Sequence, residues 1–173
     1  VAISAAAAII NYGVRVMIID LDVHHGNGTQ NIFYPSSAVY YVSLHQHPLF
    51  PGTGAIKERG TGEGLGYTLN IPLPPGSGDD IYLKMTRQAV IPALISFAPQ
   101  FVIFSSGFDA HRSDPLGMMK VTTRGFTAIY RLILNQLDRD QIPHIFVLEG
   151  GYNLRSLGNC VVMLLSELVS RYS

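Results

Sequence analysis

Three apolar runs in this sequence end in the same way, with a break at small or polar residues and then a side chain that can bind a metal or donate a proton. The segments that contain them are Val14–Thr29, Ala98–Asp109 and His144–Asn153. Apolar runs of this length are typical of strands buried on both faces of a parallel sheet. Because the carboxyl ends of neighbouring parallel strands border one crevice, we expect the three polar ends to converge.

The first two segments supply a candidate set of metal ligands. Asp22 and His24 are two residues apart, so their side chains leave the same face of an extended chain. Asp109 ends the second segment and is the natural third ligand. Three protein ligands are typical of an open catalytic zinc site. Taken alone, the first segment is equally compatible with a polar turn in which His24 is a hydrogen-bonded core residue.

The third segment ends in a tyrosine after two glycines. Tyr152 can donate a hydrogen bond from its phenol without carrying a charge, and the flanking glycines allow the backbone to approach a substrate closely. The alternative is a buried tyrosine at the end of a strand. The surrounding Glu-Gly-Gly-Tyr-Asn sequence favours the first interpretation.

Strand and helix patterns alternate along the chain. The periodicity predicts an α/β fold in which a three-layer parallel sheet carries helices on both faces. The expected strands are Arg15–Asp20, Ala38–Leu44, Tyr67–Pro72, Phe101–Ser105 and His144–Leu148. The expected helices are Val1–Tyr12, Thr29–Phe33, Asp80–Phe97, Thr123–Arg139 and Leu154–Arg171. The four glycines between Arg59 and Tyr67 lack the lysine and helix of a phosphate loop, and they predict a surface turn after the long loop His45–Gly66.

Composition agrees with one enzyme domain of residues 1–173. The chain is 47% hydrophobic with a formal net charge of +0, and it has no basic patch and no apolar run of membrane-spanning length. We therefore expect no direct nucleic-acid or membrane partner. Cys160 is the single cysteine, which favours a reducing compartment, so we expect a cytoplasmic protein, or a nuclear one in a eukaryote.

Four motifs in order resemble one known family. DLDVHHGNGTQ, SLHQHPLFPGTG, SSGFDAHRSDPLG and LEGGYN are similar to the zinc-dependent histone deacetylases and acetylpolyamine amidohydrolases, which have the arginase/deacetylase fold. The resemblance covers nearly the whole chain. Details that resemble the class II branch are Asn27, Phe108, Leu116 and Glu149.

The resemblance implies a function and the residues that perform it. The implied activity is removal of an acetyl or related acyl group from a lysine side chain or a polyamine. One zinc ion would be held by Asp22, His24 and Asp109, and a zinc-bound water molecule would attack the amide carbonyl. Tyr152 would stabilise the resulting oxyanion. From the residues alone, a site with two carboxylate ligands needs a general base as well.

Further positions are implied only by the resemblance. A structural monovalent-cation site, for K⁺, would use Asp20, the backbone oxygens of Asp22 and His24, Ser43, and the Leu44 carbonyl. Phe50 and Leu116 would line the acyl-lysine channel. The alternatives are a carboxylate at Asp20 that bonds loop amides, a core phenylalanine and a packed leucine.

One departure concerns the general base. The family uses one of two adjacent histidines in a Gly-His-His motif upstream of the ligands, and no such motif occurs here. We therefore expect a partial catalytic domain that lacks its N-terminal part and is nearly inactive alone. We also expect poor solubility or self-association, because strand Arg15–Asp20 would have an unpaired apolar edge.

The remaining histidines are not expected to replace that base. We interpret His25, His45 and His144 as structural residues that hydrogen-bond the backbone, and neither His47 nor His111 as a catalytic base.

Two other functions stay open. Asp109-Ala110-His111 suggests a two-metal ureohydrolase relative, but Ser113 stands where that family has a further carboxylate. A silent zinc- or acyl-lysine-binding module is the other alternative, and Tyr152 argues against it. The expected partner is an acetylated lysine peptide or protein, or an acetylated polyamine, and a homo-oligomer is left open.

Overall fold

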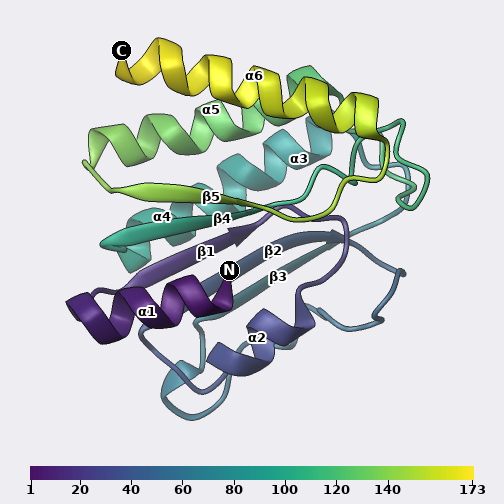
Figure 1. Cartoon of the computed structure of the whole chain (residues 1–173). Coiled ribbons are helices and arrows are strands. Elements are labelled where there is room, and N and C mark those ends of the chain that lie inside the picture. The colour runs from purple at the N-terminus through teal and green to yellow at the C-terminus, as the bar shows by residue number, and fades with distance from the viewer.

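A five-stranded parallel sheet forms the centre of the protein in the computed structural model, which describes residues 1–173 (Figure 1). The strands lie in the order β3-β2-β1-β4-β5, and every neighbouring pair is parallel. Their bounds are β1 Val16–Asp20, β2 Val39–Gln46, β3 Thr68–Leu73, β4 Phe101–Ser106 and β5 His144–Leu148. The expected α/β fold with a three-layer parallel sheet is confirmed.

Helices cover both faces of the sheet (Figure 1). Helices α1 and α2 lie on one face, and the remaining helices lie on the other (Figure 1). Their bounds are α1 Ala2–Tyr12, α2 Asn27–Phe33, α3 Asp79–Met85, η2 Thr86–Val90, α4 Ile91–Phe97, α5 Thr123–Arg139 and α6 Leu154–Tyr172, and η1 Gly62–Gly64 is a short 3₁₀ turn in the long loop. None of the helices combines the length and the apolar character that a membrane span requires.

Strand β1 lies in the middle of the sheet. Val16 pairs with Val39 on one side and with Phe101 on the other, and β1 is buried along its whole length. The prediction that this strand has an unpaired edge is therefore wrong. The apolar pattern correctly indicated an interior strand, but its two neighbours, β2 and β4, both follow it in the sequence.

The helix expected over Asp80–Phe97 is divided into three parts. An α-helix to Met85 and one from Ile91 are joined by the π-helical turn η2. Pro92 occupies the first turn of α4 and has no amide hydrogen for a carbonyl one turn earlier. A wider π turn ahead of the proline accommodates this missing hydrogen bond.

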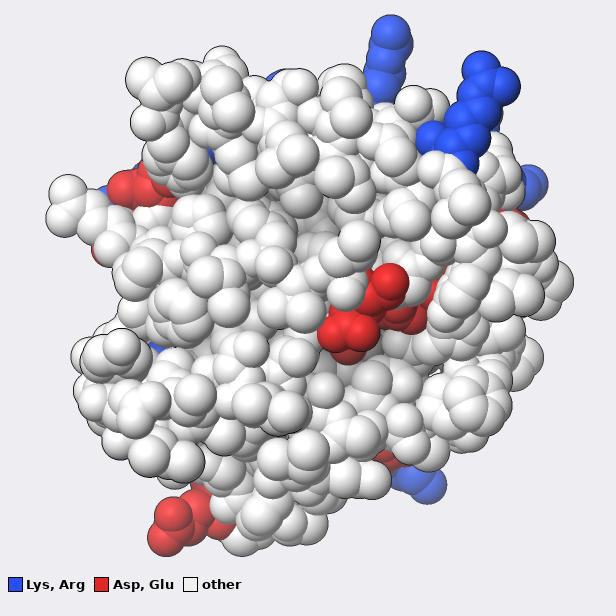
Figure 2. Space-filling view, in the orientation of Figure 1, with Lys and Arg blue, Asp and Glu red and all other residues white.

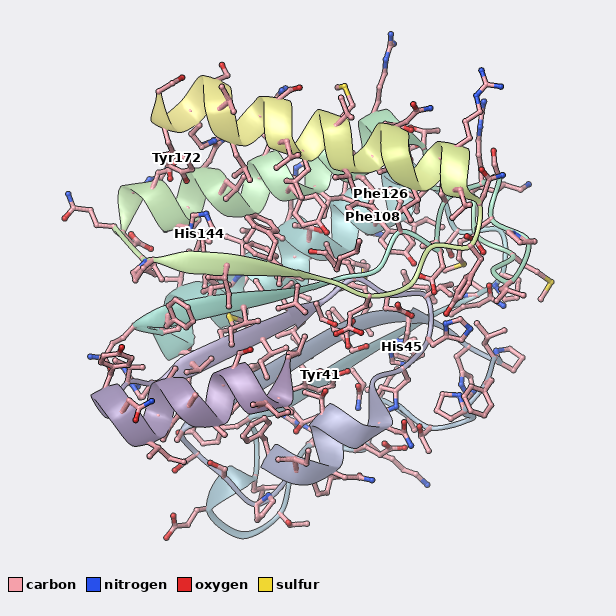
Figure 3. All side chains as sticks on the ribbon, in the orientation of Figure 1. Tyr41, His45, Phe108, Phe126, His144 and Tyr172 are labelled. Carbon is pink, nitrogen blue, oxygen red and sulfur yellow. The ribbon has the colours of Figure 1, made fainter.

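The apolar core has two layers, one on each side of the sheet. The larger one lies between the sheet and α3 to α6 and contains 26 buried residues. Phe108 and Phe126 point into it, with their ring centroids 5.1 Å apart (Figure 3). The smaller layer, of 8 buried residues, packs α1 and α2 against the other face. The alternate residues of β1 contribute to both layers, which explains why its sequence is apolar throughout.

Candidate metal centre

Strand order places the candidate ligands at one point. The chain runs from β1 outward through β2 to β3, and then returns to pair β4 with the other side of β1. In an open parallel sheet this reversal leaves a crevice at the carboxyl ends of the two central strands. Asp22 and His24 follow β1, and Asp109 follows β4, so all three lie at the crevice.

The three ligand atoms face one another. Nδ1 of His24 lies 3.1 Å from Oδ1 of Asp22 and 3.1 Å from Oδ2 of Asp109. One potential ligand atom from each residue lies within 4.8 Å of the other two. The Asp109 side chain is fully buried, and those of Asp22 and His24 are only partly exposed. The expectation that these residues converge is met, and their role as zinc ligands stays a prediction.

Backbone amides hold the two carboxylates in place. The amide of Val23 donates to Oδ1 of Asp109 at 2.7 Å, and the amide of Gly150 donates to Oδ2 of Asp22 at 3.0 Å. Gly107 allows the chains to approach this closely, because a Cβ atom there would lie 2.4 Å from Oδ2 of Asp22. Oδ2 of Asp109 and Oδ1 of Asp22 face the ring of His24, and Oδ1 of Asp22 also accepts a hydrogen bond from the amide of His24 at 2.9 Å.

The electrostatics of the cluster fit a cation. Hydrogen bonds to Asp109 and Asp22 raise the pKa of His24 to about 10. Burial, together with the nearby charge of Asp22, raises the pKa of Asp109. A proton on His24 thus supplies the positive charge that two close carboxylates require, and a divalent ion would supply it more fully. Two carboxylates and an imidazole are ordinary zinc ligands.

Tyr152 lies beside this cluster. Its ring meets that of His24 edge-on, with the centroids 6.5 Å apart. The side chain is 51% exposed, so the alternative of a buried tyrosine at a strand end is excluded. The two glycines before it turn the chain after β5 toward the crevice, and Gly151 has a φ of 142°.

The residues of the predicted cation site lie together. Asp20 and Ser43 are register partners on β1 and β2, and Leu44 follows Ser43. Asp20 is buried, and its carboxylate accepts hydrogen bonds from the amide of Asp22 and the hydroxyl of Tyr41. Burial, and then the charge of Asp22, raises the pKa of Asp20 to about 7. The loop-amide alternative is therefore partly realised, and a cation would reduce the cost of this buried charge.

The predicted channel residues lie on surface loops. Phe50 is 79% exposed and Leu116 is 52% exposed, so neither is the packed core residue of the alternative interpretation. Phe50 follows β2 and Leu116 follows β4. The two loops are joined by Gln46, whose Oε1 accepts a hydrogen bond from the amide of Met118 at 2.8 Å.

Other histidines are engaged elsewhere. His45 contacts the carbonyl of Gly54 and His144 contacts that of Ile142, in agreement with the predicted backbone contacts. His25 instead hydrogen-bonds the side chains of Thr53 and Gln30. Figure 3 shows His45 at the carboxyl ends of the strands and His144 at the opposite end of the sheet.

His111 does not join the cluster. Its ring contacts the hydroxyl of Thr123 and accepts a hydrogen bond from the amide of Ser113. The second metal position that the ureohydrolase alternative requires is not formed by this residue.

A hollow adjoins the ligand cluster on one side. Its volume is about 160 Å³, and residues that line it include Asp20, Asp22, His24 and Glu149. Figure 2 shows an acidic patch over the carboxyl ends of the strands, with the Lys and Arg side chains of this view nearer the periphery. The negative charge of the patch favours a cation rather than an anion at this end of the sheet.

Two contacts of the site were not foreseen as functional. Asp114, within the motif SSGFDAHRSDPLG, accepts hydrogen bonds from the backbone of the Tyr152 loop. Glu58 accepts hydrogen bonds from Gln30 and from the amides of Gly54 and Ala55, and so closes the loop that follows Phe50. Asp-Pro at Asp114 is typical of a turn, but nothing local indicates which distant amides a carboxylate will bind.

Comparison with known proteins agrees with the fold. The histone deacetylase domain matches residues 1–168. A probable deacetylase from Archaeoglobus fulgidus is 44% identical over 141 residues, which are 81% of this chain and 39% of that protein. The structure of an acetylpolyamine aminohydrolase from Burkholderia pseudomallei superimposes with a TM-score of 0.85 at 38% identity, over 93% of this chain and 47% of that one. The structure of the histone deacetylase Clr3 has a TM-score of 0.89 at 35% identity, over 98% of this chain and 30% of that one.

A parallel sheet with a carboxylate and imidazole cluster at its central crevice, and these structural neighbours, define a protein of the arginase-like fold. The chain belongs to the histone deacetylase family, whose members here carry the names of deacetylases and amidohydrolases. That family is generally metal-dependent. The chain spans less than half the length of each of these relatives.

Proposed function

We propose that this chain forms the metal-binding core of a zinc-dependent amide hydrolase that removes acetyl groups from lysine side chains or from polyamines. The observation that carries the proposal is the convergence of Asp22, His24 and Asp109 within 4.8 Å, beside Tyr152. The names of the relatives, histone deacetylase and acetylpolyamine amidohydrolase, support both substrate classes.

Each residue has a role that follows from its position. Asp22, His24 and Asp109 would hold the ion, and the amides of Val23 and Gly150 keep the two carboxylates oriented toward it. A bound zinc ion supplies Lewis-acid polarisation of the amide carbonyl and a more acidic water molecule. Tyr152 donates its hydroxyl proton in a hydrogen bond to the carbonyl oxygen as negative charge develops there.

Two supporting sites complete the proposal. Asp20, Ser43, Leu44 and the backbone oxygens of Asp22 and His24 would bind a monovalent cation such as K⁺, which offsets the buried charge of Asp20. Phe50 and Leu116, exposed on neighbouring loops, would line the entrance for the acyl-lysine chain.

The general base must come from outside residues 1–173 in this proposal. His24 is assigned as a ligand, and His25, His45 and His111 are engaged in other hydrogen bonds. His47 is exposed after β2 and belongs neither to the ligand cluster nor to the hollow beside it. The hollow of about 160 Å³ beside His24 leaves room for a further side chain. We therefore expect residues 1–173 alone to be nearly inactive, since one positioned acid–base group is typically worth about 10²–10⁴ in rate.

The test uses the whole natural protein that contains these residues. The zinc-loaded protein should release acetate from an acetyl-lysine peptide or an acetylated polyamine, and a chelator should abolish the release until zinc is restored. If the zinc-loaded protein binds the acetyl-lysine peptide without releasing acetate, the silent binding module is the correct function. If the purified natural protein takes up no zinc, the proposal fails.

A further inference from the structure

A buried carboxylate joins the loop of the third ligand to the loop of Tyr152. Oδ2 of Asp114 accepts hydrogen bonds from the amide of Tyr152 at 2.7 Å and from the amide of Asn153 at 3.2 Å. Oδ1 of the same carboxylate accepts one from the amide of Leu116 at 3.0 Å. Asp114 is only 7% exposed, so these charge-assisted bonds are shielded from water.

Gly150 is held by its bond to Asp22 and by the amide of Phe108, which donates to its carbonyl, but the backbone of residues 151 and 152 makes no hydrogen bond other than that to Asp114. Gly150 and Gly151 precede the tyrosine, and the φ of 142° at Gly151 belongs to a region that other residues rarely adopt. The ring itself is 51% exposed, so packing restrains it only weakly. Its direction therefore depends on where the backbone of residue 152 is fixed.

Asp114 is well placed to fix that backbone. It lies five positions after Asp109 on one connected loop, and its own amide bonds the carbonyl of His111 at 2.8 Å. Asn153 reinforces the junction, because its side chain donates to the carbonyl of Ser113 at 3.0 Å. The carboxylate also lies at the start of the 19-residue helix α6, where the helix dipole favours a negative charge.

We propose that Asp114 is a positioning residue that fixes the hydroxyl of Tyr152 relative to the metal ligands. The same carboxylate also holds the backbone of Leu116, one of the two predicted channel residues. The role rests on the proposed function, since it acts through the Tyr152 hydroxyl. Asp114 is not one of the three clustered residues, so in this role it acts through Tyr152. A shift of the Tyr152 backbone moves its hydroxyl away from the carbonyl oxygen, and a displacement of about 1 Å can cost about 10²-fold in rate.

The deciding variant is Asp114→Asn, which keeps the shape of the side chain but replaces one acceptor oxygen by a donor. Asp79→Asn is the matched control, because Asp79 also accepts a backbone hydrogen bond, from Thr122 at 2.7 Å, at the start of a different helix, α5. In the zinc-loaded natural protein we expect Asp114→Asn to lower kcat by roughly 10- to 100-fold with a small change in KM. Asp79→Asn should lower thermal stability without this loss of kcat.

A double-mutant cycle separates positioning from a general structural effect. In a Tyr152→Phe background, Asp114→Asn should lower kcat by no more than about threefold, because the hydroxyl on which it acts is absent. If the variant lowers kcat equally in both backgrounds, it does not act through Tyr152 and the proposal is overturned.

Amide hydrogen exchange tests the hold of Asp114 on the amides of Tyr152 and Asn153, here called the clamp, even if no turnover is found. Exchange at residues 152 and 153 should accelerate in Asp114→Asn and stay unchanged in Asp79→Asn, with zinc content equal in both. Unchanged exchange in Asp114→Asn would refute the clamp, whereas accelerated exchange in a protein without acetate release would count against the proposed function alone. Asp114→Ser, which removes both carboxylate oxygens, serves if the Asn variant does not fold.

Discussion

Gly150 shows how closely the backbone is packed around the ligand cluster. A Cβ atom at this position would lie 2.3 Å from Oδ2 of Asp109 and 2.5 Å from Oδ2 of Asp22. A side chain there would push both carboxylates apart. Gly150 is thus required by the close approach of the two carboxylates, in addition to any flexibility of the tyrosine loop.

At the residue scale, the first prediction concerns Asp109. Its side chain is fully buried, and its two oxygens serve the amide of Val23 and the ring of His24. Asp109→Ala should therefore greatly reduce the bound zinc, which elemental analysis of the purified natural protein measures. Asp140→Ala, an exposed carboxylate after α5, is the control and should keep the zinc content. Unchanged zinc in Asp109→Ala would remove this residue from the site.

The second prediction concerns Tyr152. In the natural protein, Tyr152→Phe should lower kcat by about 10²–10³ with a small effect on KM, because an oxyanion donor acts mainly in the transition state. Zinc content should not change, since the ring meets His24 only edge-on. A variant that keeps its kcat and only raises KM would make Tyr152 a wall of the binding site.

At the scale of elements, alanine substitutions at two glycines in long helices should change the stability of the protein in opposite directions. A Cβ atom at Gly158 in α6 would meet no atom within 4 Å, whereas one at Gly125 in α5 would lie 2.0 Å from Oδ1 of Asp79. Gly158→Ala should stabilise the protein by about 0.5–1 kcal/mol. Gly125→Ala should destabilise it by about 1–2 kcal/mol, because it disturbs the hydrogen bonds that Asp79 accepts from the N-cap residue Thr122. Denaturant unfolding measures the free energy of unfolding of both variants. Equal changes in the two variants would contradict the prediction.

The contact between α5 and α6 should depend on pH through Glu167. Hydrogen bonds from Arg131, and then from Arg171, lower the pKa of Glu167 from 4.5 to about 2. A carboxyl whose folded pKa is lowered stabilises the fold above its unfolded pKa, and that contribution is lost as the pH falls through the folded value. The loss should therefore occur between about pH 5 and pH 2.

Glu167→Gln tests this dependence. At pH 7 the variant should be less stable by about 0.5–1 kcal/mol per ion pair, reduced by salt. The difference in stability from the unsubstituted protein should shrink as the pH falls from 5 toward 2. Thermal unfolding at each pH measures this difference. A difference that does not vary with pH would show that the ion pairs contribute nothing measurable.

At the scale of the whole molecule, the edge strands of the sheet are β3 and β5, and β1 is not an edge. Strand β5 pairs with β4 alone, and its residues Ile145 and Leu148 are exposed at 37% and 56%. An apolar edge of this kind favours pairing with other chains. We expect residues 1–173 expressed alone to self-associate in size-exclusion chromatography with light scattering.

A charge in β5 should reduce this association. Ile145→Lys is expected to shift the protein toward the monomer, because a lysine on an edge strand opposes pairing. Ile3→Lys, which changes an equally apolar residue on exposed α1, should have less effect. A monomer in the unsubstituted chain would contradict the prediction.

Much of the fold and of the candidate site followed from local patterns. The bounds predicted for α5 and β5 agree with the structure, and Asp22, His24 and Asp109 meet as expected. These features depend on periodicity, on apolar burial and on the rule that parallel strands share one carboxyl edge, all of which are written in short stretches of sequence.

Only the tertiary structure decided how the elements are ordered and which distant groups meet. The apolar pattern of β1 indicated burial on both faces but not that β2 and β4 would be its neighbours, because strand pairing depends on contacts remote in sequence. The hydrogen bond that the amide of Tyr152 donates to Asp114 spans 38 positions, and no sequence periodicity predicts it. The sequence by itself therefore determined the type and place of each element and the chemistry at its end, while long-range packing determined the strand order and the hydrogen bonds that orient the site.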